Sequence, residues 1–384
     1  MSSLTEIELA RYARHLRLNG FGESSQLKLK AGKVLVIGAG GLGSPILLYL
    51  AAAGIGTIGI VDDDYVDISN LQRQILFDTD DTGESKAGTA AEKLKQLNPL
   101  INIIAHPEKI TSSNAMDIIR NYDVIADGSD NFPTRYLIND AAVLSGKPLV
   151  YGSVFRFEGQ VSVFNFLNID GSRGPNYRDL FPVSPPPESV PDCSEAGVLG
   201  VLPGIIGSIQ ALEVIKIVAG IGKVLSGKIF HFEALGMSSQ TFTLNRRIDN
   251  PLNGENPTIN TLIDYEAFCS GTNPINEITA QDFYWMKQNA EMIDLIDTRT
   301  KAEYDQVNIG GMLLPMEDII NGSADVEEKL SKNKRLIFHC KSGSRSAKAI
   351  RQLINQYGFN KDYVFNLKGG IDAYLEYQRS HSLK

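Results

Sequence analysis

The sequence predicts an α/β protein of two domains, the larger of which is built on a mostly parallel sheet. Short apolar runs of strand length alternate with stretches of helix length along most of the 384 residues, which is typical of parallel sheets. The chain also exceeds what one hydrophobic core usually supports. We expect a first domain over residues 1–248, a linker rich in Asn, Pro, Gly and Thr over 249–276, and a smaller α/β domain over 277–384.

The composition indicates a folded protein without an electrostatic basis for binding nucleic acid. Hydrophobic residues make up 43% of the chain, charged residues 21%, and the net charge is -8. Three cysteines are too few for a disulfide scaffold and are usual in a reduced compartment. Residues 1–18 are typical of an amphipathic helix with a Ser3/Glu6 capping box, and no apolar run is a convincing membrane span. We therefore expect a cytoplasmic protein that binds neither nucleic acid nor membranes.

The elements of the first domain begin with a βαβ unit. A buried strand at residues 34–37 is followed by a glycine turn, a helix entered by Ser44-Pro45 and closed near Gly54, and a strand at 58–61. Further helices and strands are expected at residues 85–97, 101–105, 124–126, 134–145 and 203–218, with β-rich stretches at 149–166 and 228–244. The second domain has expected strands at 292–296, 335–339 and 363–367.

The glycine turn after the first strand fits a Rossmann-like nucleotide site. Its glycines are Gly38, Gly40, Gly41 and Gly43, and Asp62 follows the next strand at the spacing of a dinucleotide fingerprint. Bare backbone N–H groups at the helix N-terminus would bind phosphate. A glycine turn with a purely structural role and an NAD-dependent oxidoreductase are the alternatives that this fingerprint leaves open.

The segment after Asp62 favours a triphosphate over a dinucleotide. Amide and guanidinium side chains stand where a hydride-transfer enzyme would continue into a helix, in the run Ser69, Asn70, Leu71, Gln72 and Arg73. Lys86 lies in the first turn of an expected helix, where the dipole disfavours a cation, so a nearby anion would account for it. The alternatives are a solvated acidic turn with a surface arginine and, for Lys86, a chance placement.

Asp130 and Asn131 follow another buried strand, at the position where doubly wound folds bind ligands. A carboxylate beside bound phosphates is well placed to hold Mg²⁺. The alternative is that Asp130 caps the helix that starts a few residues later.

These motifs occur in an order that resembles one family. GxGGLG, SNLQRQ, the lysine of SKA, DNFPTRYLIND and CSEAGVLG are similar to the MoeB/ThiF adenylyltransferases, relatives of the ubiquitin-activating enzymes, over residues 4–244. The resemblance implies that Gly41 and Asp62 hold ATP and that Asp130 binds Mg²⁺. It further implies phosphate contacts from the side chains of Asn70, Arg73 and Lys86.

The same resemblance implies the partners. The substrate would be the C-terminal Gly-Gly carboxylate of a ubiquitin-like sulfur-carrier protein. Arg14, in the RYxRH segment, would reach the ATP of a partner subunit in a homodimer, and the alternative is an ordinary charge on a helix face. Attack of the carboxylate on the α-phosphate needs positioning and charge neutralisation rather than a protein nucleophile.

One match to the family and one departure from it concern cysteines of the first domain. Cys193 matches a family cysteine that takes part in sulfur transfer in some members, and a small buried hydrophobe is the alternative. Many relatives bind structural zinc through two CxxC pairs, and the corresponding positions here are Asn176, Asp179, Asn250 and Asn253. Three cysteines cannot form a Cys₄ site within one protomer, so we expect no structural zinc.

The second domain carries a cysteine loop. Cys340 follows an expected strand and leads into a helix, so backbone N–H groups would surround its sulfur and favour the thiolate. The loop ends in Arg345 and Ser346. Arg345 comes one residue too early for the spacing of a protein phosphatase, which is the rival interpretation.

Other motifs of this domain strengthen one interpretation of the loop. With Asp297-Thr-Arg299, Glu303-Tyr304, Ile309-Gly-Gly311 and Gly369-Gly370, it resembles a rhodanese domain over residues 277–374. The resemblance implies a persulfide on Cys340, supplied by a donor such as a cysteine desulfurase or thiosulfate. An inactive rhodanese fold is the alternative. Cys269, in the expected linker, has no assigned role.

Together these features predict ATP-dependent adenylylation of a sulfur carrier, with sulfur delivered from Cys340 towards a thiocarboxylate. The alternatives are an NAD-dependent oxidoreductase fused to a sulfurtransferase and a non-catalytic scaffold for a ubiquitin-like protein. The pathway that the carrier would serve stays open between molybdopterin, thiamine and tRNA thiolation.

Overall fold

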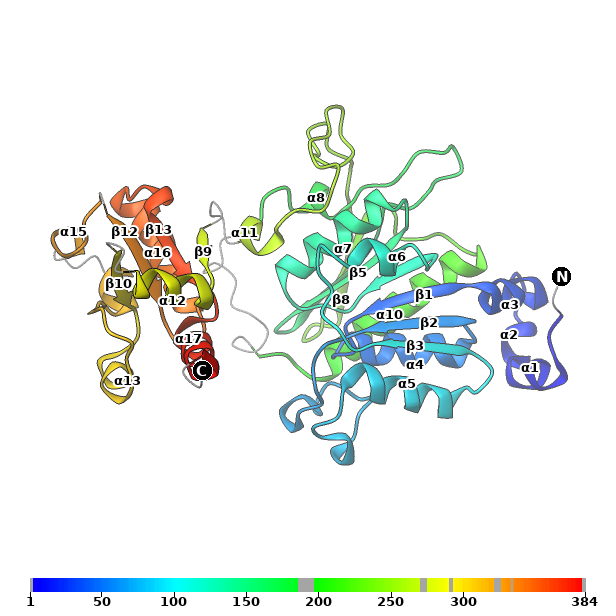
Figure 1. The fold of residues 1–384 in the computed structure, drawn as a ribbon. Coiled ribbons are helices and arrows are strands. Elements are labelled where there is room, and N and C mark those ends of the chain that lie inside the picture. Colours follow the sequence, from blue (N-terminus) through cyan, green and yellow to red (C-terminus); the bar gives the residue numbers. More distant parts are fainter. Residues whose placement is uncertain are drawn as a thin grey trace. The chain divides into compact units, whose positions relative to one another are not determined.

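The protein forms two compact units, Met1–Gly271 and Thr272–Lys384, each with its own hydrophobic cores (Figure 1). The computed structural model describes residues 3–185, 197–269, 275–289, 293–320, 326–332 and 334–381. Part of the segment expected as a linker is packed instead. Helix α11 (Tyr265–Cys269) buries Tyr265 and Cys269 in a core of the first unit. Burial of its aromatic and apolar side chains stabilises this helix, although the residues before it favour turns.

Three short helices open the first unit: α1 (Glu6–Arg11), α2 (Ala13–Leu16) and α3 (Gly22–Ala31). The capping box of α1 is not the expected Ser3/Glu6 pair. Thr5 is the N-cap and accepts from the backbone N–H of Glu8, whose carboxylate accepts from Thr5. Both pairs have the spacing of a capping box, and the pair that is formed also places Glu8 within 2.8 Å of Lys30.

The sheet of the first unit has eight strands in the order β3-β2-β1-β4-β5-β6-β7-β8. The strands are β1 (Lys33–Ile37), β2 (Thr57–Val61), β3 (Asn102–His106), β4 (Val124–Asp127), β5 (Leu149–Phe155), β6 (Glu158–Phe164), β7 (Lys228–Glu233) and β8 (Ser238–Thr243). Pairing is parallel from β3 to β5 and antiparallel from β5 to β8. The predicted α/β class with a mostly parallel sheet is confirmed.

Helices cover both faces of this sheet. On one face α4 (Gly43–Ala53), α5 (Lys86–Leu97) and α10 (Val201–Ala219) pack on strand residues such as Val34 and Val36. On the other face α6 (Ala115–Ile119), α7 (Phe132–Leu144), α8 (Tyr177–Leu180) and α11 pack on residues such as Leu35 and Ile37. Alternation of strand side chains between the two cores explains why β1 is apolar from Val34 to Ile37.

Helix α10 is long and apolar enough to cross a membrane by length and composition alone. It lies in the core against α4 and β5, and core helices of this kind meet the same criterion. Its apolar surface is therefore explained by packing.

The second unit has a five-stranded parallel sheet in the order β11-β10-β12-β13-β9. The strands are β9 (Asn276–Ile278), β10 (Ile293–Asp297), β11 (Met312–Leu313), β12 (Arg335–His339) and β13 (Val364–Leu367). The helices are α12 (Ala280–Gln288), α13 (Lys301–Gln306), α14 (Met316–Ile320), α15 (Val326–Lys329), α16 (Ser344–Tyr357) and α17 (Gly370–His381). The short edge strands β9 and β11 were not predicted.

Candidate functional site

The first candidate site lies at the switch point of the larger sheet. Strand β1 is flanked by β2 on one side and by β4 on the other. The connections after β1 and after β3 therefore run to opposite sides of β1, which opens a crevice at the carboxyl ends of the strands. A cavity of about 360 Å³ occupies this position. Five predicted site residues line it: Gly38, Gly40, Asp62, Asp130 and Asn131.

The glycine turn lies very close to the loop after β4 and to the start of α4. Gly38 has a φ of +91°, and a Cβ atom there would come within 2.8 Å of the carbonyl oxygen of Gly128 in the loop after β4. A Cβ atom on Gly43, at the start of α4, would lie 1.9 Å from the carbonyl oxygen of Gly38. The turn therefore brings the N-terminus of α4 to the crevice, where backbone N–H groups can meet phosphate.

Asp62 ties the glycine turn to the acidic loop after β2. Its carboxylate accepts from the backbone N–H of Ala39 at 2.7 Å and from that of Asp64 at 2.9 Å. Burial raises the pKa of Asp62 although these two hydrogen bonds act to lower it. The carboxylate is thus fixed at the end of β2, where a nucleotide ribose is expected.

Lys86 is held at this crevice by Asp64. The side chain of Lys86 is 5% exposed, and its Nζ lies 2.9 Å from Oδ2 of Asp64, which lines the cavity. Lys86 is the first residue of α5, after the N-cap Ser85, as the sequence predicted. The ion pair with Asp64 offsets the unfavourable helix dipole and keeps a cation beside the cavity.

The predicted segment 69–74 folds back along the glycine turn. Arg73 donates to Oδ1 of Asn70 at 2.6 Å, and a Cβ atom on Gly41 would lie 3.5 Å from Cγ of Arg73. Leu71 packs against the core on the α4 face. Arg73 and Asn70 therefore lie beside the glycine turn, although neither of the two lines the cavity, as Gly38 and Gly40 do.

Ser69 and Gln72 have structural contacts at the ends of this segment. The backbone N–H and hydroxyl of Ser69 donate to Asp67, the N-cap of a 3₁₀ turn, at 2.8 and 2.5 Å. Gln72 lies against Gly200, just before α10, where a Cβ atom would meet its Oε1 at 2.5 Å. Turns rather than a long helix thus follow Asp62, which disfavours the dehydrogenase alternative.

Asp130 faces the cavity and does not cap the following helix. The N-cap of α7 is Asn131, whose side chain accepts from the backbone N–H of Thr134 at 2.9 Å. Asp130 is exposed, and its one hydrogen bond within the described ranges is a long one from Asn131, at 3.5 Å. Asp130 lines the same cavity as Asp62, Asp63 and Asp64, whose carboxylate oxygens lie close to one another, and oxygen-rich sets of this kind are what Mg²⁺ favours.

Arg14, a further predicted residue of this unit, does not line the cavity. Arg14 lies on α2, is exposed, and makes no hydrogen bond or ion pair with another described residue. This freedom fits a residue that acts on a partner subunit and fits a surface charge equally well. Cys193 lies outside the described residues.

Amide and carboxylate groups hydrogen-bond to one another at the four positions that correspond to the zinc-binding CxxC pairs of many relatives. Asp179 accepts from the backbone N–H of Asn176 at 2.7 Å, from that of Arg247 at 2.8 Å and from Nδ2 of Asn250 at 2.7 Å. Nδ2 of Asn176 donates to Oδ1 of Asn253 at 3.1 Å. The two amide nitrogens are donors that face oxygen atoms, so this amide cluster, Asn176, Asp179, Asn250 and Asn253, does not fit a metal ion.

The second candidate site is the cysteine loop of the smaller unit. Cys340 follows β12, is fully buried, and its Sγ accepts from the backbone N–H of Gly343 at 3.2 Å. Burial acts to raise the pKa of Cys340, but hydrogen bonds from Ser346, Gly343 and Ser342 outweigh it and lower the pKa. The predicted cradle of backbone donors around the sulfur is formed at the N-terminus of α16.

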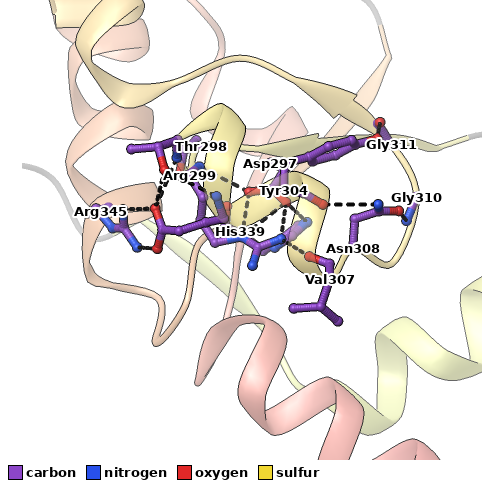
Figure 2. Close-up of polar contacts among 12 residues, drawn as sticks. Asp297, Thr298, Arg299, Tyr304, Val307, Asn308, Gly310, Gly311, His339 and Arg345 are labelled. Carbon is purple, nitrogen blue, oxygen red and sulfur yellow. Dashed lines mark hydrogen bonds and ion pairs between the residues drawn. The ribbon is translucent and has the colours of Figure 1, made fainter.

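A buried ion pair joins the end of β10 to the loop after α13. Arg299 donates to both carboxylate oxygens of Asp297, at 2.6 Å for the shortest contact, and also to the carbonyl oxygen of Val307 at 2.7 Å (Figure 2). Asp297 is fully buried, and Arg299 is nearly so. The pair fixes the loop that follows α13 against the end of β10.

The predicted Gly369-Gly370 pair packs on the other side of the cysteine loop. A Cβ atom on Gly370 would lie 2.6 Å from the carbonyl oxygen of Cys340, and the backbone N–H of Ile371 donates to that oxygen at 2.8 Å. The glycine therefore permits a contact that holds the loop from the α17 side.

Sequence reasoning missed residues of the first site. Lys109 and Ile110, after β3, line the first cavity and also a neighbouring one of about 530 Å³. They follow a parallel strand, so the rule that was applied to Asp62 and Asp130 could have found them. Asp64 stood in the acidic run but was given no role.

Comparison with known proteins defines the class. The ThiF family model matches residues 12–252, and the model of the rhodanese-like domain matches residues 279–377. The chain belongs to the ThiF family and carries a C-terminal rhodanese-like domain, as its motifs predicted.

Several named relatives match this chain over different lengths. The probable adenylyltransferase/sulfurtransferase MoeZ of Mycobacterium tuberculosis is 44% identical over 382 residues, which cover 98% of this chain and 95% of that protein. The adenylyltransferase and sulfurtransferase MOCS3 of Mus musculus is 41% identical over 92% of this chain and 81% of its own length. The sulfur carrier protein adenylyltransferase of Thermus thermophilus is 51% identical over 69% of this chain and 98% of its own length.

A solved structure supports the fold of the larger unit. The crystal structure of MccB from E. coli with MccA-N7isoASN has a TM-score of 0.57 at 21% identity, and covers 64% of this chain and 75% of that chain. At this identity the likeness concerns the fold alone.

Proposed function

We propose that this chain uses ATP to adenylylate the C-terminal carboxylate of a ubiquitin-like sulfur-carrier protein and that Cys340 supplies sulfur towards a thiocarboxylate. One observation carries the proposal. A crevice with a glycine turn and the carboxylates of Asp62 and Asp130, with Lys86 and Arg73 close by, occurs in one chain with a thiolate-stabilising cysteine loop. The names of the relatives, including a sulfur carrier protein adenylyltransferase, support the same function.

The first step is transfer of an adenylyl group. A carboxylate oxygen of the carrier attacks the α-phosphorus of ATP, the bond to the β-phosphate oxygen breaks, and pyrophosphate leaves with the electron pair. In this proposal Arg73 and Lys86 neutralise the developing charge, and the N-terminus of α4 orients the phosphates. Asp130 would hold Mg²⁺, which supplies further positive charge at the leaving group.

The second step transfers sulfur. The outer sulfur of a Cys340 persulfide attacks the acyl carbon, the carbon–oxygen bond to AMP breaks, and the carrier is left joined to Cys340 through a disulfide. A second thiolate attacks Sγ of Cys340 and releases the thiocarboxylate, and an external thiol then reduces the new disulfide. Cys193 is our candidate for the second thiolate.

Exposed apolar side chains at the antiparallel end of the first sheet offer a surface for a protein partner. Phe155 and Phe157 flank the β5–β6 turn, and Leu235 and Met237 lie in the β7–β8 turn, with exposures of 37 to 75%. The two turns are adjacent, because the backbone N–H of Ala234 donates to the carbonyl oxygen of Phe157. Four large apolar groups in adjacent turns are typical of a binding surface, and we propose that the carrier docks there.

Three further features belong to the proposal. The enzyme acts as a homodimer, with the free side chain of Arg14 reaching the ATP of the partner. It needs no structural zinc, because hydrogen bonds within the amide cluster take the place of metal ligands. It works in the cytoplasm, which fits the scarcity of cysteine.

The test is carrier-dependent ATP–pyrophosphate exchange with the purified chain. We expect exchange in the presence of a carrier that ends in Gly-Gly and loss of exchange with Asp130→Asn. The carrier should gain the mass of AMP, and then that of a thiocarboxylate once a sulfur donor is added. Absence of exchange, or tighter binding of NAD(H) than of Mg-ATP, would refute the adenylyltransferase function.

A further inference from the structure

The arginine of the cysteine loop is already paired within the second unit. Nη1 of Arg345 donates to Oε2 of Glu303 at 2.8 Å and Nη2 donates to Oε1 at 2.6 Å, the fork geometry of a strong bidentate pair. Both side chains are 32% exposed, so the pair lies at the surface beside the loop. Hydrogen bonding by Arg345 lowers the pKa of Glu303 to about 2, so the carboxylate is charged at neutral pH.

Glu303 is held in place independently of Arg345. It is the third residue of α13, and its Oε2 accepts from the backbone N–H and from the hydroxyl of Thr300, both at 3.0 Å. The backbone N–H of Glu303 donates in return to the hydroxyl of Thr300, which completes a capping box. The carboxylate is therefore preorganised towards Arg345, whose hydrogen bonds are drawn as dashed lines in Figure 2.

Backbone N–H groups of the loop and the side chain of Ser346 supply most of the stabilisation of the sulfur, and Arg345 adds only a smaller interaction with it. A free guanidinium at the mouth would instead attract a small dianion. With Glu303 in place, such a ligand meets a neutralised pair. Lys341 is then the only cation of the loop that makes no ion pair with another described residue.

We propose that Glu303 is a specificity-determining residue that disfavours dianionic sulfur donors such as thiosulfate and leaves persulfide donors as the preferred class. The inference rests on the proposed sulfurtransferase function. With a persulfide, the Cys340 thiolate attacks the outer sulfur, the donor S–S bond breaks, and the donor thiolate leaves with the electron pair. With thiosulfate the leaving group is sulfite, and its sulfonate charge must be accommodated before attack.

The test measures persulfide formation on Cys340 of the full chain by mass spectrometry. The donors are thiosulfate and 2-hydroxyethyl persulfide, and the variant is Glu303→Gln, whose amide oxygen can still accept from Thr300. We expect kcat/KM for thiosulfate to rise about tenfold, the size expected for removing one carboxylate about 6 Å from a dianion in an aqueous dielectric. The value for the persulfide should change less than about threefold.

Asp305→Asn is the matched control. Asp305 lies on the same helix, is exposed, and pairs with Lys301 rather than with Arg345. The substitution Asp305→Asn removes one negative charge but leaves Arg345 paired with Glu303, so kcat/KM for thiosulfate should change little.

Three results would overturn the inference: an equal rise in Asp305→Asn, no rise in Glu303→Gln, or an equal loss with both donors. Absence of Cys340 persulfide in the wild-type chain with either donor would reject the sulfurtransferase function together with this inference. A failure confined to the variants leaves that function standing. Pyrophosphate exchange, which uses the other unit, reports separately on adenylylation.

Discussion

Asp179→Ala tests whether hydrogen bonds alone hold the amide cluster of the first unit. Asp179 is 7% exposed and accepts three hydrogen bonds, from the backbone N–H groups of Asn176 and Arg247 and from Nδ2 of Asn250. The bonds from Arg247 and Asn250 join α8 to the segment after β8, across about 70 residues of sequence. Alanine would remove both acceptor oxygens and leave the three donors unpaired.

The expected loss follows from the number and kind of these bonds. Each hydrogen bond to a charged group contributes about 1.5–3 kcal/mol, and water reaching the vacated site recovers part of the loss. We therefore use the lower end and expect a decrease of about 4 kcal/mol in the free energy of unfolding of the first unit. In a unit of this size the melting temperature should fall by about 8–16 °C.

The assay can separate the two units because the single tryptophan of the chain, Trp285, lies on α12 of the second unit. Circular dichroism reports on the whole chain, and Trp285 fluorescence reports on the second unit alone. Asp179→Ala should lower the dichroism transition and leave the fluorescence transition in place. Asp170→Ala is the control, since Asp170 is exposed and its hydrogen bonds stay within its own loop.

Metal addition and removal complete this test. Neither EDTA nor Zn²⁺ should move the melting temperature of the wild-type chain by more than about 2 °C, since the side chains of the amide cluster hydrogen-bond to one another rather than to a metal ion. The reasoning fails if Asp179→Ala shifts the transition no more than Asp170→Ala does. It also fails if EDTA destabilises the wild-type chain as much as the substitution does.

Four other outcomes are expected. Lys86→Met should lower kcat of carrier-dependent pyrophosphate exchange by about 100-fold or more, because a preorganised cation at the phosphates is lost. Cys340→Ser should abolish thiocarboxylate formation on the carrier, measured by mass, and leave pyrophosphate exchange intact. Phe157→Asp should raise the KM for the carrier in the exchange assay about tenfold without changing the Kd for ATP, since it alters only the apolar turn. Glu303 has its pKa lowered from 4.5 to about 2, so its ion pair stabilises the second unit above pH 4.5, and this contribution is lost as the pH falls towards 2. Glu303→Gln should remove that acid dependence, measured by urea unfolding followed through Trp285 fluorescence.

Local signals in the sequence predicted the elements that position both sites. Strand β1, the glycine turn and α4 were found because a buried strand, a turn that needs positive φ and a helix start each leave a mark within a few residues. The short strand β11 left no such mark, because two residues carry no periodicity. The Thr5 cap was misplaced by two residues, since Ser3 and Thr5 both precede a glutamate by three.

Pairs between distant segments could not be predicted in the same way. The contacts of Lys86 with Asp64 and of Arg345 with Glu303 depend on loops that meet only in the folded chain. Residue types at the carboxyl ends of strands indicated which groups would lie near a ligand, but not which of these side chains would form ion pairs with one another. α11 was missed for a related reason, because its helix is one turn long and its burial depends on α7.

The two sites use different physical means, and this difference argues that their chemistry can be separated within one chain. Adenylyl transfer needs charge that is brought to phosphate by side chains, so single substitutions of Lys86 or Asp130 should disable it. The thiolate of Cys340 is stabilised chiefly by backbone N–H groups, which substitutions outside the loop leave in place. Each site also lies over its own hydrophobic core. Damage to one site should therefore leave the partial reaction of the other measurable, and joint loss of both activities in a folded Cys340→Ser variant would contradict that independence.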